Sequence, residues 1–383
     1  MSPGKTMPAA LEQDDSKSMF HLIPLEDLQA EYLPSLVPTL PETMCQIGMV
    51  MTTLYTQEHG QTSDPDSITA KMSEDPCAHY RSTPFPSPAS ESQPTTVYHL
   101  TMSRVSRSCY IIANTEANLK AALTAHGVDY AKDESEEDAA TREAREAKIK
   151  ADVYIQEQFE IFRTVAREVV KMLNEGVDAE TAKTPVYFCS INRIWFRAVT
   201  SLYPTIHREG PAIKFAISEK DLLAAESNLL AEMQAIADRK GWTFGPMKKS
   251  DAPLMIEKNS LKYDLEYGEH VAERSVCFRD QAGNMVAWAG SHFDLAVAAL
   301  YVLPEYRKEG LGRLILYYVN MVHAKRLREL LNGTSQSTVD PSLLYMHADT
   351  EAYNVPTQKF MLRCGYKIVN YTNWFTIVPI EGN

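Results

Sequence analysis

The sequence predicts a mixed α/β protein built around a largely antiparallel sheet. Three observations lead to this fold class. Two long segments, 153–173 and 218–241, carry apolar residues at helical spacing. The runs 96–103 and 108–115 are short, apolar and close together, which is typical of paired strands. After residue 241, short helical and strand-like segments alternate, and this order is typical of helices packed on a mixed sheet.

Length and composition indicate an ordinary globular protein. The 383 residues are enough for two or three domains of about 100–200 residues each. Hydrophobic residues make up 44% of the chain and charged residues 23%, and the formal net charge is −12. Such an acidic chain is not expected to bind nucleic acid in general, so any anion site must be local.

No segment predicts membrane insertion or secretion. No window approaches 18 consecutive apolar residues, and the N-terminus lacks the basic-then-apolar pattern of a secretory signal. The six cysteines are far apart and form no C-x-x-C pair or zinc-spaced cluster. We therefore expect a cytoplasmic protein with reduced, mostly buried thiols and no metal.

The first domain is expected to span residues 19–240. It follows a polar tail, residues 1–18, that we expect to be disordered. Residues 19–55 begin with helical spacing and end in a β-like run. Segment 80–96 concentrates Pro and Ser, which predicts a mobile insert.

The rest of this domain is expected to contain long helices and a buried strand. The mixed charges of 131–151 predict an exposed helix that leads into a core-facing helix over 153–173. A buried strand over 185–191 follows. The helix over 218–241 has a serine cap and ends at Gly241, which places the domain boundary near residue 240.

The second domain is expected to span residues 241–383. A hairpin around Ala282–Gly283 precedes an apolar central strand over 293–302, which Pro304 ends because proline cannot donate to a strand ladder. A helix begins at about Gly310. The remaining predicted elements are helical structure over 251–274, a strand over 343–349, a short helix over 354–365 and a strand over 366–380.

The turn before the helix at Gly310 has the chemistry of an anion site. Its sequence, residues 302–316, is VLPEYRKEGLGRLIL. A helix N-terminus offers free N–H groups, and two glycines let an anion approach the backbone. Arg307 and Arg313 add positive charge. The alternative is an ordinary strand–turn–helix with surface arginines, because short glycine motifs recur by chance.

These residues resemble the acetyl-CoA-binding motif of the GNAT superfamily of N-acyltransferases, R-x-x-G-x-G/A after a central strand that ends in V-x-P. The stretches GNMVAWAG, LYMHAD, NVPTQK and YTNWFTIVPI resemble the glycine N-acyltransferase branch, over about residues 244–383. Residues 22–44 resemble the start of the same relatives more weakly. The resemblance implies a GNAT fold with two GNAT-like domains in tandem, the N-terminal one degenerate and without its own glycine motif.

The resemblance also implies a co-substrate, acetyl-CoA or another acyl-CoA. Its pantetheine would pair with the central strand where that strand splays from its neighbour, and its pyrophosphate would lie on the glycine turn. A backbone N–H near Tyr301 would stabilise the oxyanion of the tetrahedral intermediate. The implied cofactor-binding residues are Leu300, Tyr301 and Val302 for pantetheine, Arg307, Lys308, Gly310, Leu311, Gly312 and Arg313 for the phosphates, and Asn354 for the pantetheine arm.

The general base departs from the relatives' pattern. They carry a glutamate eleven residues before the motif arginine, where this chain has Ala296. Asp294 and His292 lie two and four residues earlier, on the same face of an extended strand, and we prefer Asp294. The alternative for Asp294 is a carboxylate bound by a backbone N–H. His347 matches the histidine of Y-x-H-x-D and is either a substrate contact or a buried, hydrogen-bonded histidine.

The general acid also departs from the pattern. Many GNAT enzymes protonate the leaving thiolate with a tyrosine four residues before the closing glycine, and this position is Met361. Solvent, Tyr353 or no group at all then serves instead.

The sequence therefore predicts an acyl-CoA-dependent N-acyltransferase, an N-acetyltransferase above all, in which the amine of a small molecule attacks the thioester directly. The alternative is a CoA-binding or scaffold protein whose catalytic groups have decayed, because Ala296 and Met361 fit that history equally well. A protein or histone acetyltransferase is less favoured. We expect a small-molecule amine acceptor as partner, no nucleic acid or membrane, and a monomer or homodimer.

Overall fold

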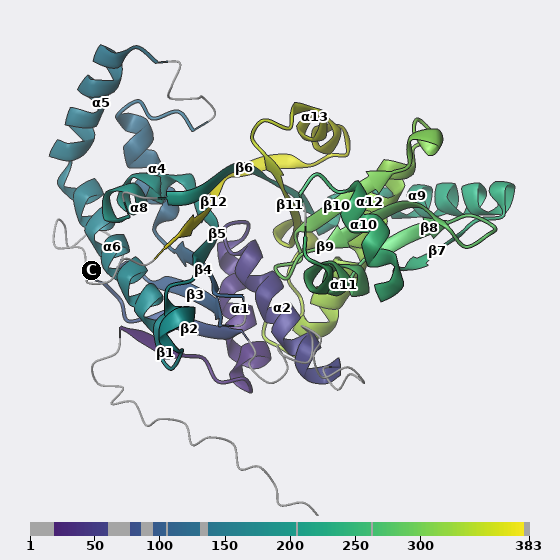
Figure 1. Cartoon of the computed structure of the whole chain (residues 1–383), viewed down its shortest axis with the longest axis horizontal. Coiled ribbons are helices and arrows are strands. Elements are labelled where there is room, and N and C mark those ends of the chain that lie inside the picture. Colours follow the sequence, from purple (N-terminus) through teal and green to yellow (C-terminus); the bar gives the residue numbers. More distant parts are fainter. Residues whose placement is uncertain are drawn as a thin grey trace, which may run out of the picture.

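The computed structural model describes residues 19–59, 77–85, 95–104, 106–130, 137–203, 206–261 and 263–378. Within these ranges the chain forms one twelve-stranded, mostly antiparallel sheet with helices packed against it (Figure 1). The predicted mixed α/β fold class is confirmed. None of the described helices has the length and apolar character needed to cross a membrane.

Among the described residues, the N-terminal half, up to the predicted boundary near residue 240, contributes six strands and most of the helices. Its strands are β1 (Phe20–Leu22), β2 (Ala78–Ser82), β3 (Tyr98–Ser103), β4 (Ser108–Ala113), β5 (Val186–Asn192) and β6 (Ile206–Ser218). Its α-helices are α1 (Leu33–Leu36), α2 (Met44–His59), α4 (Glu116–Ala125), α5 (Ala139–Ala151), α6 (Val153–Asn174), α7 (Ala179–Ala182), α8 (Phe196–Leu202) and α9 (Glu219–Lys240).

The C-terminal half contributes the other six strands. They are β7 (Thr243–Pro246), β8 (Val276–Arg279), β9 (Met285–Ser291), β10 (Val297–Val302), β11 (Tyr345–Glu351) and β12 (Lys367–Ile377). Its α-helices are α10 (Ala252–Lys258), α11 (Leu265–Glu273), α12 (Leu311–Leu331) and α13 (Val355–Arg363), and a short 3-10 turn, η6 (Pro304–Tyr306), follows β10.

The two halves exchange their last strands. The strand order across the sheet is β1-β2-β3-β4-β5-β12-β6-β11-β10-β9-β8-β7. Strand β6 of the N-terminal half therefore lies beside β11 of the C-terminal half, and β12 lies beside β5. The exchanged strands also pair antiparallel with each other, from Lys367↔Ala216 to Ile377↔Ile206. In Figure 1 they cross the middle of the molecule and join the two halves into one sheet.

Each half contains one parallel strand pair that diverges after a short contact. In the C-terminal half, β10 and β11 are in register only at Val297↔Ala348. In the N-terminal half, β4 and β5 are in register only at Ser108↔Tyr187 and Cys109↔Phe188. Beyond these points the strands part, so the same local geometry occurs twice in the sheet.

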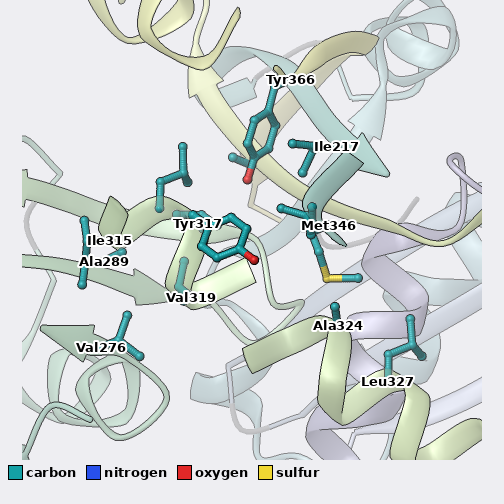
Figure 2. Close-up of a cluster of buried hydrophobic side chains, with 14 of the residues drawn as sticks. Ile217, Val276, Ala289, Ile315, Tyr317, Val319, Ala324, Leu327, Met346 and Tyr366 are labelled. Atoms are coloured by element: carbon teal, nitrogen blue, oxygen red, sulfur yellow. The ribbon is translucent and has the colours of Figure 1, made fainter. Parts of the chain in front are cut away.

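The exchanged strands carry apolar side chains into the opposite half. Phe215 of β6 belongs to a core that includes α12 and β8–β11 of the C-terminal half, and Phe375 of β12 belongs to the core formed by β3–β5 and α6 of the N-terminal half. Figure 2 shows Ile217 of β6 in the first of these cores, near Met346 of β11 and Tyr366, above the side chains of α12. Apolar burial thus holds the two halves together.

One predicted element is wrong in type. The segment 19–55 was expected to end in a β-like run, but residues 44–59 form helix α2. Residues 43–53 are all buried, so the pattern has no polar face from which a helical period could be read. Gly48 allows this helix to lie directly on the β9–β10 turn, because a Cβ there would come within 1.8 Å of the backbone oxygen of Asp294.

Most other expectations are confirmed in the described residues. Strands β3 and β4 pair antiparallel, α5 is largely exposed, and α6 packs in the core. The Ser218 hydroxyl caps α9, which ends at Gly241 with a φ of 66°. Strand β6 was not predicted. Of the expected insert over 80–96, residues 80–82 belong to β2, and residues 86–94, like the expected tail 1–18, lie outside the described residues.

Candidate active site

The turn between β10 and α12 is the place where the sequence predicts an anion cradle. Strand β10 ends at Val302, η6 follows, and Gly310 is the N-cap of α12 with a φ of 80°. No described side chain caps this helix. The first backbone N–H groups of this 21-residue helix therefore carry partial positive charge and have no side-chain partner. An anion can accept hydrogen bonds from them.

The two motif glycines have different roles. Gly310 needs its left-handed backbone, and a Cβ there would meet no described atom within 4 Å. Gly312 lies beside α13, where a Cβ would approach the Phe360 ring to 3.4 Å. Lys308 also has a positive φ, 71°, which shows how sharply the chain turns before the helix.

The two motif arginines are held in different ways. Arg307 donates from Nε to the carbonyl oxygen of Val302 at 3.1 Å, and its guanidinium lies 5.3 Å from the centre of the Tyr301 ring. Arg313 forms an ion pair of 2.5 Å with Glu232 of α9, and both side chains are largely exposed. Such an exposed pair contributes little to stability, so Arg313 remains accessible to a phosphate.

The strand residues predicted to hold pantetheine lie at the divergence of β10 and β11. A bulge occurs between Ala298, which pairs with Gly290, and Tyr301, which pairs with Trp288, and Ala299 has a φ of 47°. Leu300, Tyr301 and Val302 follow the parting of the strands and are only partly buried. A bulge changes the direction in which backbone N–H and C=O groups point. This bulge lies where β11 diverges from β10.

Asn354 lies at the N-terminus of α13 and already has a structural role. Its Oδ1 accepts from the amide of Thr357 at 3.2 Å, and its Nδ2 donates to Glu351 at 3.5 Å. Capping thus engages both polar atoms of the side chain.

The strand assumption for Asp294 and His292 is wrong. Residues 292–296 form a turn between β9 and β10, closed by bonds from the His292 amide to Ala296 O and from the Leu295 amide to His292 O. The two-residue period does not apply across a turn. Asp294 is fully buried, and its Oδ1 accepts from the Ala296 amide at 3.1 Å, as the alternative assignment for this residue anticipated.

Asp294 belongs to a buried polar cluster at the centre of the sheet. Its Oδ2 lies 3.6 Å from Nε2 of His347 on β11. The Cys45 sulfur of α2 lies 3.8 Å from the same nitrogen and 3.0 Å from Nζ of Lys214 on β6. Lys214 in turn donates to Oδ2 of Asp349 on β11 at 3.0 Å. The cluster joins elements of both halves.

Charges in this cluster stabilise one another. Burial alone would raise the pKa of Asp294, but His347 and then Lys214 outweigh it and hold that pKa well below its usual range. Burial alone would lower the pKa of Lys214, but Asp349 and its other neighbours raise it. Burial raises the pKa of the Cys45 thiol well above its ordinary value. The cluster thus contains an ionised Asp294, a charged Lys214 and a neutral Cys45 thiol.

The same cluster includes a group with suitable atoms for a metal. Ligand atoms of Cys45, Asp294 and His347 all lie within 4.8 Å of one another. The Lys214 ammonium, however, is already 3.0 Å from the sulfur and supplies a positive charge at this place. We therefore infer that the Lys214 ammonium balances the negative charge of the cluster.

The His292 imidazole lies among aromatic side chains. Its Nδ1 is hydrogen-bonded to the Tyr267 hydroxyl at 2.6 Å, and its ring lies 6.5 Å from that of Trp374. Desolvation lowers the pKa of His292, and the Asp294 carboxylate opposes this only in part. The imidazole is therefore neutral near pH 7 and keeps the capacity to bind a proton.

Sequence reasoning missed Lys214, Cys45 and Asp349. Lys214 lies in an unpredicted strand, and Cys45 in a helix taken for a strand. A lysine within the otherwise apolar run 211–217 was the available signal, because a buried lysine needs a charged partner.

No protein-family model matches the chain, and no curated protein matches it significantly. Among solved structures, the X-ray structure of a Drosophila protein is similar with a TM-score of 0.51 and 13% identity, over 94% of this chain and 99% of that one. This likeness over nearly the whole length shows a shared fold.

Two acetyltransferase structures are similar at lower scores. A tandem GNAT protein from the clavulanic acid biosynthesis pathway has a TM-score of 0.39 and 8% identity, over 93% of this chain and 97% of that chain. A GCN5-related N-acetyltransferase from Sphaerobacter thermophilus has a TM-score of 0.34 and 11% identity, over 94% and 96%.

Proposed function

We propose that this protein is an acyl-CoA-dependent N-acyltransferase that acts on the amine of a small molecule. One observation carries the proposal: the divergence of β10 from β11 leads directly into an uncapped helix N-terminus preceded by Arg307 and Gly310. The first feature leaves strand backbone open to an extended pantetheine chain, and the second is an anion site. Together they match the shape and charge of an acyl-CoA.

The residues present fit this co-substrate. The amides of Leu311 and Gly312 would bind phosphate oxygens, with Arg313 and Lys308 adding charge. Arg307 donates a hydrogen bond to the Val302 carbonyl oxygen and so holds the end of β10. From this position its guanidinium would contact a phosphate. The bulged strand at Leu300 to Val302 would align pantetheine and direct an N–H toward the thioester oxygen.

The transfer requires the amine to lose one proton. The amine nitrogen attacks the carbonyl carbon, a C–N bond forms, and the C–S bond breaks so that CoA leaves as a thiolate and takes up a proton. Asp294 is a weak base, because its pKa is depressed and one oxygen is held by the Ala296 amide. We therefore assign proton acceptance to His292, with Asp294 stabilising the imidazolium that forms.

A second candidate, a CoA-binding protein without catalysis, is favoured by two buried positions. Ala296, where the relatives have their base, is fully buried, and Met361, where many GNAT enzymes have their acid, is 3% exposed. Neither offers a proton-transfer group. Tyr353, the other acid considered, is 75% exposed and contacts Glu351 at 3.4 Å.

Calorimetry with acetyl-CoA tests the binding part of the proposal. Arg307→Ala should weaken binding about tenfold through the loss of one charged contact. Arg239→Ala, which removes an exposed arginine at the end of α9, is the matched control and should bind normally. Equal affinity of both variants would contradict the cradle.

Thiol release from acetyl-CoA with a panel of amines tests the catalytic part. We expect turnover that is kept through the ordinary titration range of histidine and falls only at more acidic pH, because desolvation lowers the pKa of His292. The rate should be at least about a hundredfold lower in His292→Gln. Binding of acetyl-CoA without turnover on any amine would instead establish the non-catalytic candidate. An unchanged rate in His292→Gln would exclude it as the base.

A further inference from the structure

The hydroxyl of Tyr267 is a proton-transfer group to which no role has been assigned. Tyr267 lies in the first turn of α11, where its amide donates to Oδ1 of Asp264 at 2.7 Å. Its hydroxyl lies 2.6 Å from Nδ1 of His292, and no other described residue forms a hydrogen bond with it. Nε2 of His292 has no hydrogen-bond partner among the described residues either. The pair therefore has one free position at each end.

Aromatic contacts hold both rings of this pair in place. The centre of the Tyr267 ring lies 5.1 Å from that of Tyr263 and 5.3 Å from that of Phe293, edge to face in both cases. The His292 ring lies 5.9 Å from that of Tyr263 and 6.5 Å from that of Trp374. The orientation of the two rings therefore does not depend on their shared hydrogen bond alone.

Tyr267 lies on the same face of the sheet as the side chains of the strand proposed to hold pantetheine. It packs against the hydrophobic cluster that contains Trp288 of β9, and Ala299 and Tyr301 of β10 pack against the same cluster. Trp288 pairs with Tyr301 in the sheet, and their rings stack with centres 5.2 Å apart. His292 belongs to the turn that leads into β10. The pair thus lies beside the strand along which the thioester is proposed to bind.

Both members of the pair are neutral near pH 7. Burial raises the pKa of Tyr267 well above its ordinary value, and the neighbouring Tyr263 and Asp294 add to this effect. Desolvation lowers the pKa of His292. A hydroxyl has one hydrogen and two lone pairs, so the phenol can accept a hydrogen bond from Nδ1–H and donate its own hydrogen elsewhere. The pair can therefore take up a proton at one end and release one at the other.

We propose that Tyr267 is the general acid of the acyl transfer and forms one proton relay with His292, an assignment that rests on the proposed function. Nε2 of His292 accepts the proton that the amine loses as the C–N bond forms. Nδ1 then gives its proton to the Tyr267 oxygen, and the Tyr267 hydroxyl proton goes to the sulfur as the C–S bond breaks. One proton thus moves from the amine to the thiol. His292 ends as its other neutral tautomer, and exchange with water restores the first.

Thiol-release kinetics of the full chain compare Tyr267 with a matched control. Tyr267→Phe removes only the hydroxyl and should lower kcat with acetyl-CoA at least about a hundredfold, with an unchanged KM for acetyl-CoA. Tyr263→Phe removes a hydroxyl that is bonded to the Asn259 side chain and keeps the ring beside His292, so it should retain the wild-type kcat. An equal kcat in the wild type and Tyr267→Phe would overturn the relay and leave the acyltransferase standing.

A selenium analogue of the co-substrate separates an acid from a structural role. In the acetyl selenoester of CoA the leaving group is a selenolate, which is a weaker base than a thiolate and leaves without a proton. The loss of kcat in Tyr267→Phe should therefore be at least about tenfold smaller with the selenoester, whereas the loss in His292→Gln should be the same with both co-substrates. An equal loss in Tyr267→Phe with both co-substrates would overturn the role of Tyr267 as the acid.

The hydrogen bond between the two side chains is testable without any reaction. In the full chain with isotope-labelled histidine nitrogens, the NMR signals of His292 are those that disappear in His292→Gln. The Nδ1 signal should shift in Tyr267→Phe and stay in place in Tyr263→Phe. An unshifted signal in Tyr267→Phe would overturn the relay, whatever the activity. Thiol release by the wild type with no amine at all would overturn the proposed function, and the relay with it, even where the signal shifts.

Discussion

The strand-to-helix turns after β10 and β4 share one geometry but differ in what lies at the start of the helix that follows. After β10, Gly310 leaves the first amides of α12 uncapped. After β4, the side chain of Glu116 itself occupies the start of α4, and Trp195 and Asn192 hold it there. A carboxyl group supplied by the chain thus accepts the hydrogen bonds at the turn after β4, whereas the amides after β10 have no side-chain partner among the described residues. The side chain at the helix start, rather than the strand arrangement, decides which turn can bind an anion.

The largest expected effect on stability concerns the exchanged strands β6 and β12, which join the two halves. Phe215 and Phe375 are each carried by an exchanged strand into the opposite core, and they are 0% and 3% exposed. Each Phe→Ala change should cost about 3–5 kcal/mol of unfolding free energy. Denaturant unfolding followed by both tryptophan fluorescence and circular dichroism should show a single shared transition. Separate unfolding transitions for the two halves would contradict the role of these strands in joining them.

The variant Glu116→Gln tests the turn after β4, where the Glu116 side chain occupies the start of α4. Protonated Glu116 is favoured in the folded state, so folding binds a proton between pH 4.5 and about 7, and stability falls as pH rises through this window. At about 1.4 kcal/mol for each pH unit, this dependence amounts to about 3 kcal/mol. The glutamine variant should lose it. Unfolding free energies measured from pH 5 to pH 8 check this, and an unchanged slope would contradict a raised pKa.

The smallest expected effect is at the open turn. Gly310→Ala places a side chain at a φ of 80°, which costs about 1–2 kcal/mol of stability, while no described atom lies within 4 Å to clash with the new Cβ. Thermal unfolding should report this loss. Gly245→Ala is a useful comparison, because that glycine has an ordinary φ and the same free space. Equal losses in both variants would show that the left-handed backbone is not the cause.

What the sequence could predict depended on how local the signal was. Pro304, Gly310 and the apolar period of α12 lie within a few turns of one another, so the turn and the start of the helix were predictable in place and in type. Helix α2 was not, because its burial by both halves removes the polar face that marks a surface helix. Lys214 shows the same limit. Its partners Cys45 and Asp349 are 169 and 135 residues away in the chain.

Asp294 shows a subtler limit. Its importance was predicted from its spacing to the motif arginine, and it does lie beside His347, but it lies in a turn rather than on a strand face. The turn depends on Leu295, whose φ is 59°, and on the approach of Gly48 from α2. The pattern of residues 293–302 contains no signal for either feature. The position of Asp294 in the sequence therefore indicated that it lies near the site, but the direction of its side chain could not be predicted.

The strand exchange also dictates an order of events during synthesis. Strand β6 leaves the ribosome well before β11 and β12, its two neighbours in the sheet. Until those strands arrive, both edges of β6 and one edge of β5 are unpaired, and such edges are sites for association with other chains. The N-terminal half therefore cannot complete its fold as an early, independent unit. Nascent chains that stop short of residue 367 should depend on chaperones, and the native sheet forms late through contacts between distant parts of the chain.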